Sequence, residues 1–164
     1  MADPTALSFV PSRILVPMDF SPSSLAALGT AADLAAHFRA ALILAHIVPE
    51  FVTSTVPDFF PESKFLDHAR KAAEGRFNAY QLELSAKGID VSYCIQQGND
   101  IAGQILLVIE REKIDFLVIS THGLTGWHPL VFGSTAEKIV KLAQCPLLLL
   151  RSAKPEEEQR EASQ

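Results

Sequence analysis

The sequence predicts an α/β domain built on an open five-stranded parallel sheet with helices on both faces. Five short apolar runs alternate along the chain with four stretches in which apolar residues recur at helical spacing. Three of these runs are continuous, which is typical of strands buried on both sides in a parallel sheet. The length of 164 residues fits one domain. Strand–helix–strand connections in such a sheet are right-handed.

The chain opens with a predicted strand at Arg13–Pro17. After it, Ser21 has the side chain of a helix N-cap, and Pro22 suits the first helical position. An Ala-rich helix is expected from there, with one apolar face formed by Leu25, Leu28, Ala32, Leu34, Ala35 and Phe38. The long apolar run Ala41–Val48 predicts the second strand.

The later segments continue this alternation. Residues 49–60 contain two prolines and show no period, so we expect a loop there. The expected elements after it are a helix at 61–87, a strand at 91–96, a turn at 97–100, a helix at 101–112, a strand at 115–120, a loop at 121–132, a helix at 134–143 and a strand at 146–150. Gly88 stands where a C′ glycine would end the long helix.

These elements place the folded domain at residues 13–151. Residues 1–12 form an N-terminal extension, and residues 152–164 form a polar acidic tail that is expected to fray.

Composition argues against several classes of protein. The 14 basic and 19 acidic side chains give a formal charge of −5, whereas nucleic-acid-binding modules usually carry a basic excess. No apolar run reaches the roughly 20 residues that span a bilayer, and residues 1–12 lack a secretory signal pattern. Cys94 and Cys145 form neither a CxxC pair nor a disulfide framework, so we expect two buried thiols and a cytoplasmic protein. None of the five histidines has metal-ligand spacing.

The connection after the strand at 115–120 carries the strongest signal for a ligand. Ligands of open parallel sheets bind beyond the carboxyl ends of the strands, near the point where strand order reverses. This connection has 13 residues, Thr121 to Gly133, and three of the eight glycines. Such connections usually have about 2–6 residues. Glycine lets main-chain N–H groups approach an anion, and Gly133-Ser-Thr135 opens a helix whose N-terminus favours phosphate. A second interpretation, compatible with the first, makes Ser134 an N-cap in a capping box with Glu137.

Five segments, taken together and in order, resemble the universal stress protein family. They are Ile14-Leu-Val-Pro-Met-Asp-Phe-Ser21, Ala45-His-Ile-Val48, Val118-Ile-Ser-Thr-His-Gly-Leu-Thr-Gly126, Val131-Phe-Gly-Ser-Thr-Ala-Glu-Lys138 and Cys145-Pro-Leu-Leu-Leu149. The resemblance runs from Arg13 to Arg151. Family members that bind ATP carry the pattern G-x2-G-x9-G-[ST]. Here the pattern is Ser120-x2-Gly123-x9-Gly133-Ser134, so serine replaces the first glycine.

The resemblance implies a Rossmann-like fold of the adenine nucleotide alpha hydrolase type, with strand order 3-2-1-4-5. It implies ATP with Mg²⁺ or Mn²⁺ as the ligand. By position, Asp19 would accept hydrogen bonds from the ribose hydroxyls, Pro17 and Met18 would line the adenine side, and Ile47 would meet the base through its backbone. The full set of residues expected at the site is Pro17, Met18, Asp19, Ile47, Ser120, Thr121, His122, Gly123, Gly126, Gly133, Ser134 and Thr135. As alternatives, Asp19 would be an Asx-type cap on the first helix and Ile47 a plain core residue.

Other nucleotide motifs are missing from the sequence. There is no G-x4-G-K-[ST] P-loop, and no G-x-G-x-x-G follows the first strand. A flavodoxin-like site stays open, because Ser21-Pro-Ser-Ser24 forms a hydroxyl-rich segment after that strand. Within the family resemblance three functions stay open. They are a nucleotide-dependent regulator of the stress response with unknown protein partners, a slow ATPase, and an interaction module that has lost nucleotide binding. The regulator is favoured because no general base is clearly placed for attack on a γ-phosphate.

The last strand predicts a homodimer. Leu147–Leu150 is apolar at every position, so both faces of the strand should be buried. In the expected strand order this strand lies at an edge of the sheet, where unpaired N–H and C=O groups invite a partner. A two-fold axis would pair it antiparallel with the same strand of a second copy. A monomer whose acidic tail covers the edge is the alternative.

Overall fold

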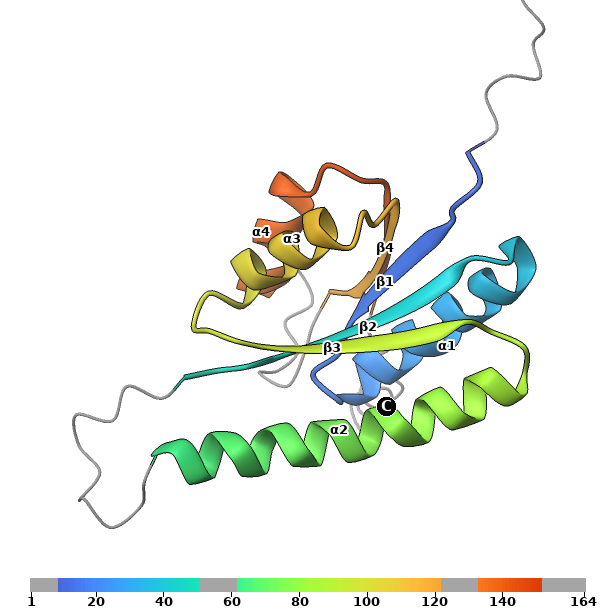
Figure 1. Ribbon diagram of the computed structural model, residues 1–164. Coiled ribbons are helices and arrows are strands. Elements are labelled where there is room, and N and C mark those ends of the chain that lie inside the picture. Colours follow the sequence, from blue (N-terminus) through green and yellow to red (C-terminus); the bar gives the residue numbers. More distant parts are fainter. Residues whose placement is uncertain (1–8, 51–61, 122–132, 152–164) are drawn as a thin grey trace, which may run out of the picture.

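The computed structural model describes residues 9–50, 62–121 and 133–151 of the chain. Its strands are β1 (Arg13–Pro17), β2 (Ala41–Val48), β3 (Val91–Gln97), β4 (Phe116–Ser120) and β5 (Leu147–Leu150). They form one sheet in the order β3-β2-β1-β4-β5 (Figure 1). Every neighbouring pair is parallel. The predicted fold class and strand order are therefore confirmed.

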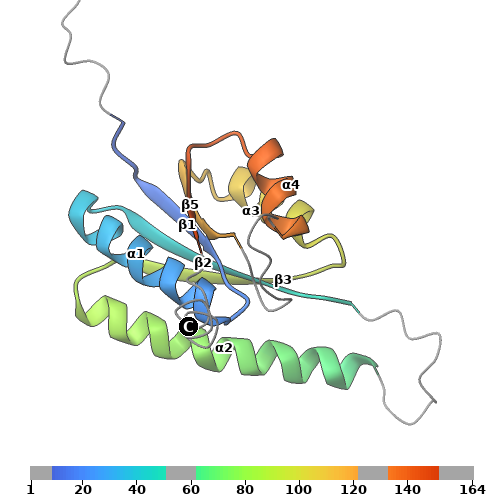
Figure 2. The same ribbon diagram turned by 180° about the vertical axis from the view of Figure 1, so that it is seen from behind.

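Four helices cover the sheet in two layers. They are α1 (Pro22–Phe38), α2 (Glu62–Ala86), α3 (Ile101–Arg111) and α4 (Ser134–Leu142). In Figure 1 and from behind in Figure 2, α1 and α2 lie on one face of the sheet, and α3 and α4 lie on the other. The chain crosses from β3 at one edge to β4 beside β1, so the strand order reverses between β1 and β4. A crevice at the carboxyl ends of these two strands is the expected ligand site of such a sheet.

The core divides along the sheet because successive strand residues point to opposite faces. On the face covered by α1 and α2, Ile14, Val16 and Leu44 pack with Phe77 of α2. On the face covered by α3 and α4, Leu15, Ala45 and Ile47 pack with residues such as Ile105 and Ile139. β1 therefore has three fully buried residues in a row, as its unbroken apolar sequence predicts.

Three predicted helix boundaries are confirmed, including the start of α4 at Ser134, but the N-cap considered for α4 is not. The Ser21 side chain caps α1, and Pro22 is the first helical residue. Gly88, with φ +79°, follows the C-terminal end of α2. The predicted capping box at α4 is absent, because the N-cap is Gly133 and Ser134 is already helical. Glu137 instead accepts a hydrogen bond from Lys141 one turn further along the helix, at 2.6 Å.

Two apolar faces differ from expectation. Leu25, expected on the buried face of α1, is 39% exposed. The α1 face against the sheet consists of small residues and one leucine, namely Ser24, Ala27, Leu28, Ala31, Ala32 and Ala35. All four leucines of β5 are only half-buried within this chain, although both faces of the strand were expected to be buried. The reason is the place of β5 at the edge of the sheet, where the described residues provide no neighbouring strand on one side.

Candidate functional site

A cavity of about 400 Å³ lies at the carboxyl edge of the sheet. It is bordered by the residues that follow β1, by the end of β2, by the end of β4 and by the first turns of α3 and α4. Its position matches the reversal of strand order between β1 and β4.

Nine of the twelve residues expected at the site line this one cavity. They are Pro17, Met18, Asp19, Ile47, Ser120, Thr121, Gly133, Ser134 and Thr135. The other three, His122, Gly123 and Gly126, lie outside the described residues. Residues up to 118 positions apart in the sequence, from Pro17 to Thr135, are thus brought together by the meeting of strand ends at one edge.

The segment after β1 is fixed to the sheet and to α1. The Met18 N–H donates to the Ala45 carbonyl at 2.7 Å, which extends the β1–β2 pairing by one residue. The Asp19 carboxylate accepts from both the N–H (3.0 Å) and the hydroxyl (2.6 Å) of Ser21. Asp19 therefore makes the Asx-type contact to the first helix and also lines the cavity. The two roles considered for Asp19 in the sequence are compatible in space.

The start of α4 faces the cavity without a side-chain cap. Ser21 caps α1 and Asp100 caps α3, whereas Gly133 has no side chain to accept the N–H groups of the first turn of α4. Gly133 also has an ordinary backbone, with φ −57°. A Cβ added there would meet only one described atom within 4 Å, the Thr121 carbonyl oxygen at 3.5 Å. The protein's own described packing thus does not require glycine, and the open space fits a cradle for an anion.

Ser120 occupies the position of the first motif glycine. It is the last residue of β4 and is paired with Leu150 of β5. Its φ is not positive, since Phe20, Arg39 and Lys113 are the non-glycine residues of the described chain that have positive φ. Serine therefore brings no backbone strain at this position.

The floor of the cavity is apolar and includes residues that sequence reasoning missed. Ile101 and Ile105 of α3 and Ile119 of β4 line it, as do His46 and Pro49 from the end of β2. The isoleucines of α3 follow a helical period in the sequence, and nothing in that period distinguishes a core position from a cavity wall. His46 had a detectable signal, because it is a polar residue near the carboxyl end of an otherwise apolar strand.

The side chains of the described residues that line the cavity carry a net negative charge. Among the described residues that line it, Asp19 is the one acidic side chain, and no lysine or arginine is present. Lys138 of α4 lies close by in sequence but is paired with the Asp100 carboxylate at 2.7 Å. The hydrogen bond from Lys138 holds the pKa of Asp100 below its ordinary value. An anionic ligand therefore meets backbone N–H groups and hydroxyls but no cationic side chain of the described lining.

Neither cysteine is an activated nucleophile, and the described chain has no cluster of metal-ligating side chains. Cys94 and Cys145 are unpaired and half-buried, and neither lines the cavity. Burial raises the pKa of both thiols, which leaves them protonated and poorly nucleophilic at neutral pH. Residues 9–50, 62–121 and 133–151 contain no cluster of three metal-ligating side chains. No helix within those ranges is both long and apolar enough to cross a membrane.

Comparison with known proteins points to one family. The model of the universal stress protein family matches residues 11–151. A universal stress protein of Bacillus subtilis is 26% identical over 148 residues, which cover 85% of this chain and 99% of the relative. The solved universal stress protein of Lactobacillus plantarum superposes with a TM-score of 0.78 at 24% identity, covering 88% of this chain and all of that chain.

Two further solved structures contain a bound nucleotide. A universal stress protein in complex with cAMP superposes with a TM-score of 0.64 at 20% identity, covering 88% of this chain and all of that one. A universal stress protein from Archaeoglobus fulgidus in complex with dAMP superposes with a TM-score of 0.59 at 15% identity, covering 86% and 98%. At these identities the likeness establishes a shared fold.

Proposed function

Because the chain belongs to the universal stress protein family and has a cavity at the carboxyl edge of its sheet, we propose that it binds ATP with Mg²⁺ or Mn²⁺. In this proposal it acts as a nucleotide-dependent regulator in the stress response and changes protein partners with its bound state. A cytoplasmic location, expected from the sequence, stays part of the proposal. One observation carries the assignment. Nine residues expected at a nucleotide site, from separate segments of the chain, line a single cavity.

The cavity suits the three parts of an adenine nucleotide. Its apolar floor, with Ile47, Ile101 and Ile105, would bury one face of the base. The Asp19 carboxylate would accept hydrogen bonds from ribose hydroxyls. The first turn of α4, with Ser134 and Thr135, would donate N–H and hydroxyl groups to phosphate oxygens. The ligands of the cAMP and dAMP complexes, cited above for other family members, share the base and a phosphate with ATP.

A regulatory role is favoured over ATP hydrolysis by the chemistry of the lining. Hydrolysis needs a group that orients or deprotonates a water in line with the γ-phosphate. The described lining residues at the start of α4 are glycine, serine, threonine and alanine, and none of these is a good general base. Asp19, a carboxylate, belongs to the segment after β1, where the ribose is proposed to lie.

The experiment that tests this function is a direct analysis of the ligand. Mass spectrometry of the small molecules released by denaturing the purified protein should find adenine nucleotide. Titration of nucleotide-free protein with ATP and with GTP should show preference for ATP. A flavin in the released fraction would support the flavodoxin-like alternative instead. Failure of the folded protein to bind ATP would favour the interaction module.

Phosphate release separates the regulator from the slow ATPase. The regulator predicts a release rate with the wild-type protein that is no higher than the rate with an Asp19→Ala variant. A rate that depends on Asp19 and on the cation would establish hydrolysis.

A further inference from the structure

We propose that His46 is a positioning residue that fixes Asp19 for the ribose, so that it acts on nucleotide affinity through the turn between β1 and α1. This inference rests on the proposed function, since it names how one wall of that site is held. Sequence reasoning assigned no role to His46. The structure places His46 among the residues that line the cavity, and its ring contacts both ends of the turn that carries Asp19.

The first contact is a hydrogen bond to the residue before Asp19. His46 Nδ1 lies 2.7 Å from the Met18 carbonyl oxygen. A carbonyl can only accept, so Nδ1 is the nitrogen that carries the proton. Met18 is 3% exposed, and its N–H is held by Ala45 at 2.7 Å. Two consecutive residues of β2 therefore hold both backbone groups of Met18, and the histidine supplies the second of these bonds.

The second contact lies on the other side of Asp19. Phe20 has φ +62°, a left-handed conformation that a bulky residue adopts only when its surroundings impose it. Its ring is held by three neighbours. They are the His46 ring with centroids 4.8 Å apart, the Phe77 ring at 5.2 Å, and the Arg76 guanidinium at 4.8 Å from the ring centroid. His46 thus touches the residues on both sides of Asp19.

These contacts differ in kind from the local bonds of the turn. The bonds from Ser21 to Asp19 join residues two positions apart and can move together with the turn. The His46 contacts join the turn to the sheet across 28 positions of sequence. Without the imidazole donor, the buried Met18 carbonyl loses its partner, and the turn is free to shift toward water. Asp19 is then held less firmly relative to Ile47 and α4, although the Met18 N–H and the Phe20 contacts to Phe77 and Arg76 remain.

The test measures affinity for two nucleotides with wild-type protein and with a His46→Leu variant. ATP presents both ribose hydroxyls, and 2′,3′-dideoxy-ATP presents none. We expect His46→Leu to weaken ATP binding about tenfold, which corresponds to about 1.4 kcal/mol. The dideoxy nucleotide should lose clearly less affinity, because it makes no ribose contact to Asp19, and its retained binding also shows that the variant is folded. A purely structural role would weaken both ligands equally.

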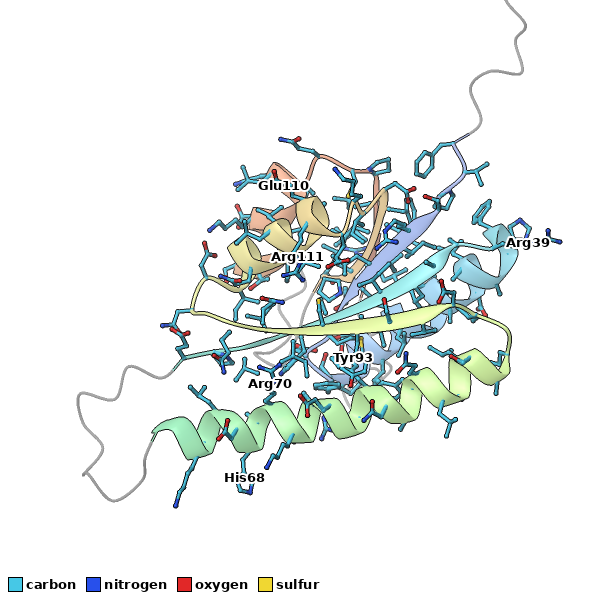
Figure 3. All side chains as sticks on the ribbon, in the orientation of Figure 1. Arg39, His68, Arg70, Tyr93, Glu110 and Arg111 are labelled. Carbon is cyan, nitrogen blue, oxygen red and sulfur yellow. The ribbon has the colours of Figure 1, made fainter. Side chains whose placement is uncertain are left out.

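Three further variants sharpen the test. His46→Asn places an amide N–H near the position of Nδ1 and should restore ATP affinity. His46→Leu should add little to the loss caused by Asp19→Ala, because both changes remove the same interaction. His68→Leu is the matched control, since Figure 3 shows His68 on the outer side of α2, pointing away from the sheet. It should bind both nucleotides as the wild type does.

The outcomes are distinguishable. If the folded wild-type protein binds neither nucleotide, the proposed function fails and the inference fails with it. If the wild type binds ATP and His46→Leu binds it equally well, the inference alone is overturned. Equal losses for ATP and the dideoxy nucleotide also overturn it. A clearly larger loss for ATP than for the dideoxy nucleotide, reversed by His46→Asn, supports it.

Discussion

Gly133 is the residue at which a phosphate would come closest to the backbone. Its φ of −57° suits any amino acid, and a Cβ would stand 3.5 Å from the Thr121 carbonyl, an ordinary contact. We therefore expect Gly133→Val to fold, with a loss of about 1 kcal/mol at the N-cap. The branched side chain would fill the space that phosphate needs. Calorimetry should show at least about a tenfold loss of ATP affinity, or about 1.4 kcal/mol.

Gly29 offers a matched control for that substitution. It is exposed on α1, and a Cβ there would meet no described atom within 4 Å. Gly29→Val should leave ATP affinity unchanged. Equal affinities for Gly133→Val and Gly29→Val would show that phosphate does not lie at the α4 start.

Ser120 tests whether the altered glycine motif matters. Since Ser120 ends β4 in an ordinary extended conformation, no positive φ has to be accommodated. Ser120→Gly should therefore not tighten ATP binding, and it should lower the free energy of unfolding by roughly 0.5–1 kcal/mol through backbone entropy. Parallel titration and urea unfolding measure both quantities. A clear gain in affinity would mean that the serine side chain obstructs the ligand.

At the scale of elements, Asp115 joins the start of β4 to the start of β1. Its carboxylate accepts hydrogen bonds from the N–H groups of Ser12 and Arg13 and from the Ser12 hydroxyl. Burial alone would raise the pKa of Asp115, but these hydrogen bonds outweigh it and lower the pKa below the ordinary 3.8. A lowered pKa means that the stabilisation is present above about pH 4 and is lost as pH falls through the folded-state value.

Replacement of Asp115 should therefore change stability in a pH-dependent way. Asp115→Asn should lower the free energy of unfolding at pH 7 by about 1 kcal/mol, allowing for solvent screening of a partly exposed group. The difference from wild type should shrink as pH falls below about 4. Denaturant unfolding at several pH values measures this, with the exposed Asp33→Asn on α1 as control. A difference in unfolding free energy between wild type and Asp115→Asn that stays constant with pH would contradict a stabilising role for the ionised Asp115 carboxylate.

The small positive charge at the N-terminus of α4 predicts that ATP binding needs a divalent cation. ATP carries several negative charges, while the helix N-terminus supplies only about half a unit of positive charge. No lysine or arginine is found among the described residues that line the cavity. Tight binding should therefore need Mg²⁺ or Mn²⁺. Titration of ATP in excess chelator should show a large loss of affinity. Equal affinity with and without chelator would refute the inference that a divalent cation is needed.

The elements themselves could be predicted from sequence almost to the residue. An unbroken apolar run marks the strand at Ala41–Val48, and an N-cap residue followed by proline marks the helix start at Ser21–Pro22. Both signals agree with the structure. The start of α4 at Ser134 was also predicted, but its N-cap was not, because Ser134 and Glu137 have the spacing of a capping box. The bond from the Gly133 N–H to Thr121 at 3.1 Å joins the residue before Ser134 to the end of β4, and Gly133 becomes the N-cap.

The candidate site was predictable to a similar degree, for a different reason. Residues that follow parallel strands meet at one edge whatever their identity, so Asp19, Ser120 and Gly133 could be placed together in advance. The contributions of His46 and the α3 isoleucines depend on how side chains pack around the turn after β1. Hydrophobic period assigns those residues to a face of an element and does not say which of them border a cavity.

At the scale of the whole molecule, the free edge of β5 carries a prediction about assembly. The carbonyls of Pro146 and Leu150 accept from β4, from Leu117 and Thr121 respectively. Backbone groups alternate in direction along a strand, so Leu148 also faces β4. Leu147 and Leu149 then direct their N–H and C=O groups to the free edge. All four side chains are half-buried, which leaves apolar surface for a second copy to cover.

We therefore expect a homodimer with antiparallel β5 pairing. Light scattering at micromolar concentration should give a mass near twice the 17.9 kDa of one chain. Leu149→Pro should give a folded monomer, because it removes a donor at the free edge. Leu148→Pro should instead weaken the β4–β5 pairing and lower thermal stability. A wild-type mass near 18 kDa would contradict the dimer and favour an edge covered by the chain's own acidic tail.

The central claim, that this molecule binds an adenine nucleotide at the carboxyl edge of its sheet, is tested most directly by calorimetric titration of ATP with Mg²⁺ into the nucleotide-free wild-type protein. We predict saturable binding of one ATP per chain, weakened at least about tenfold by Gly133→Val. Absence of binding by the folded wild-type protein up to millimolar ATP would contradict the claim.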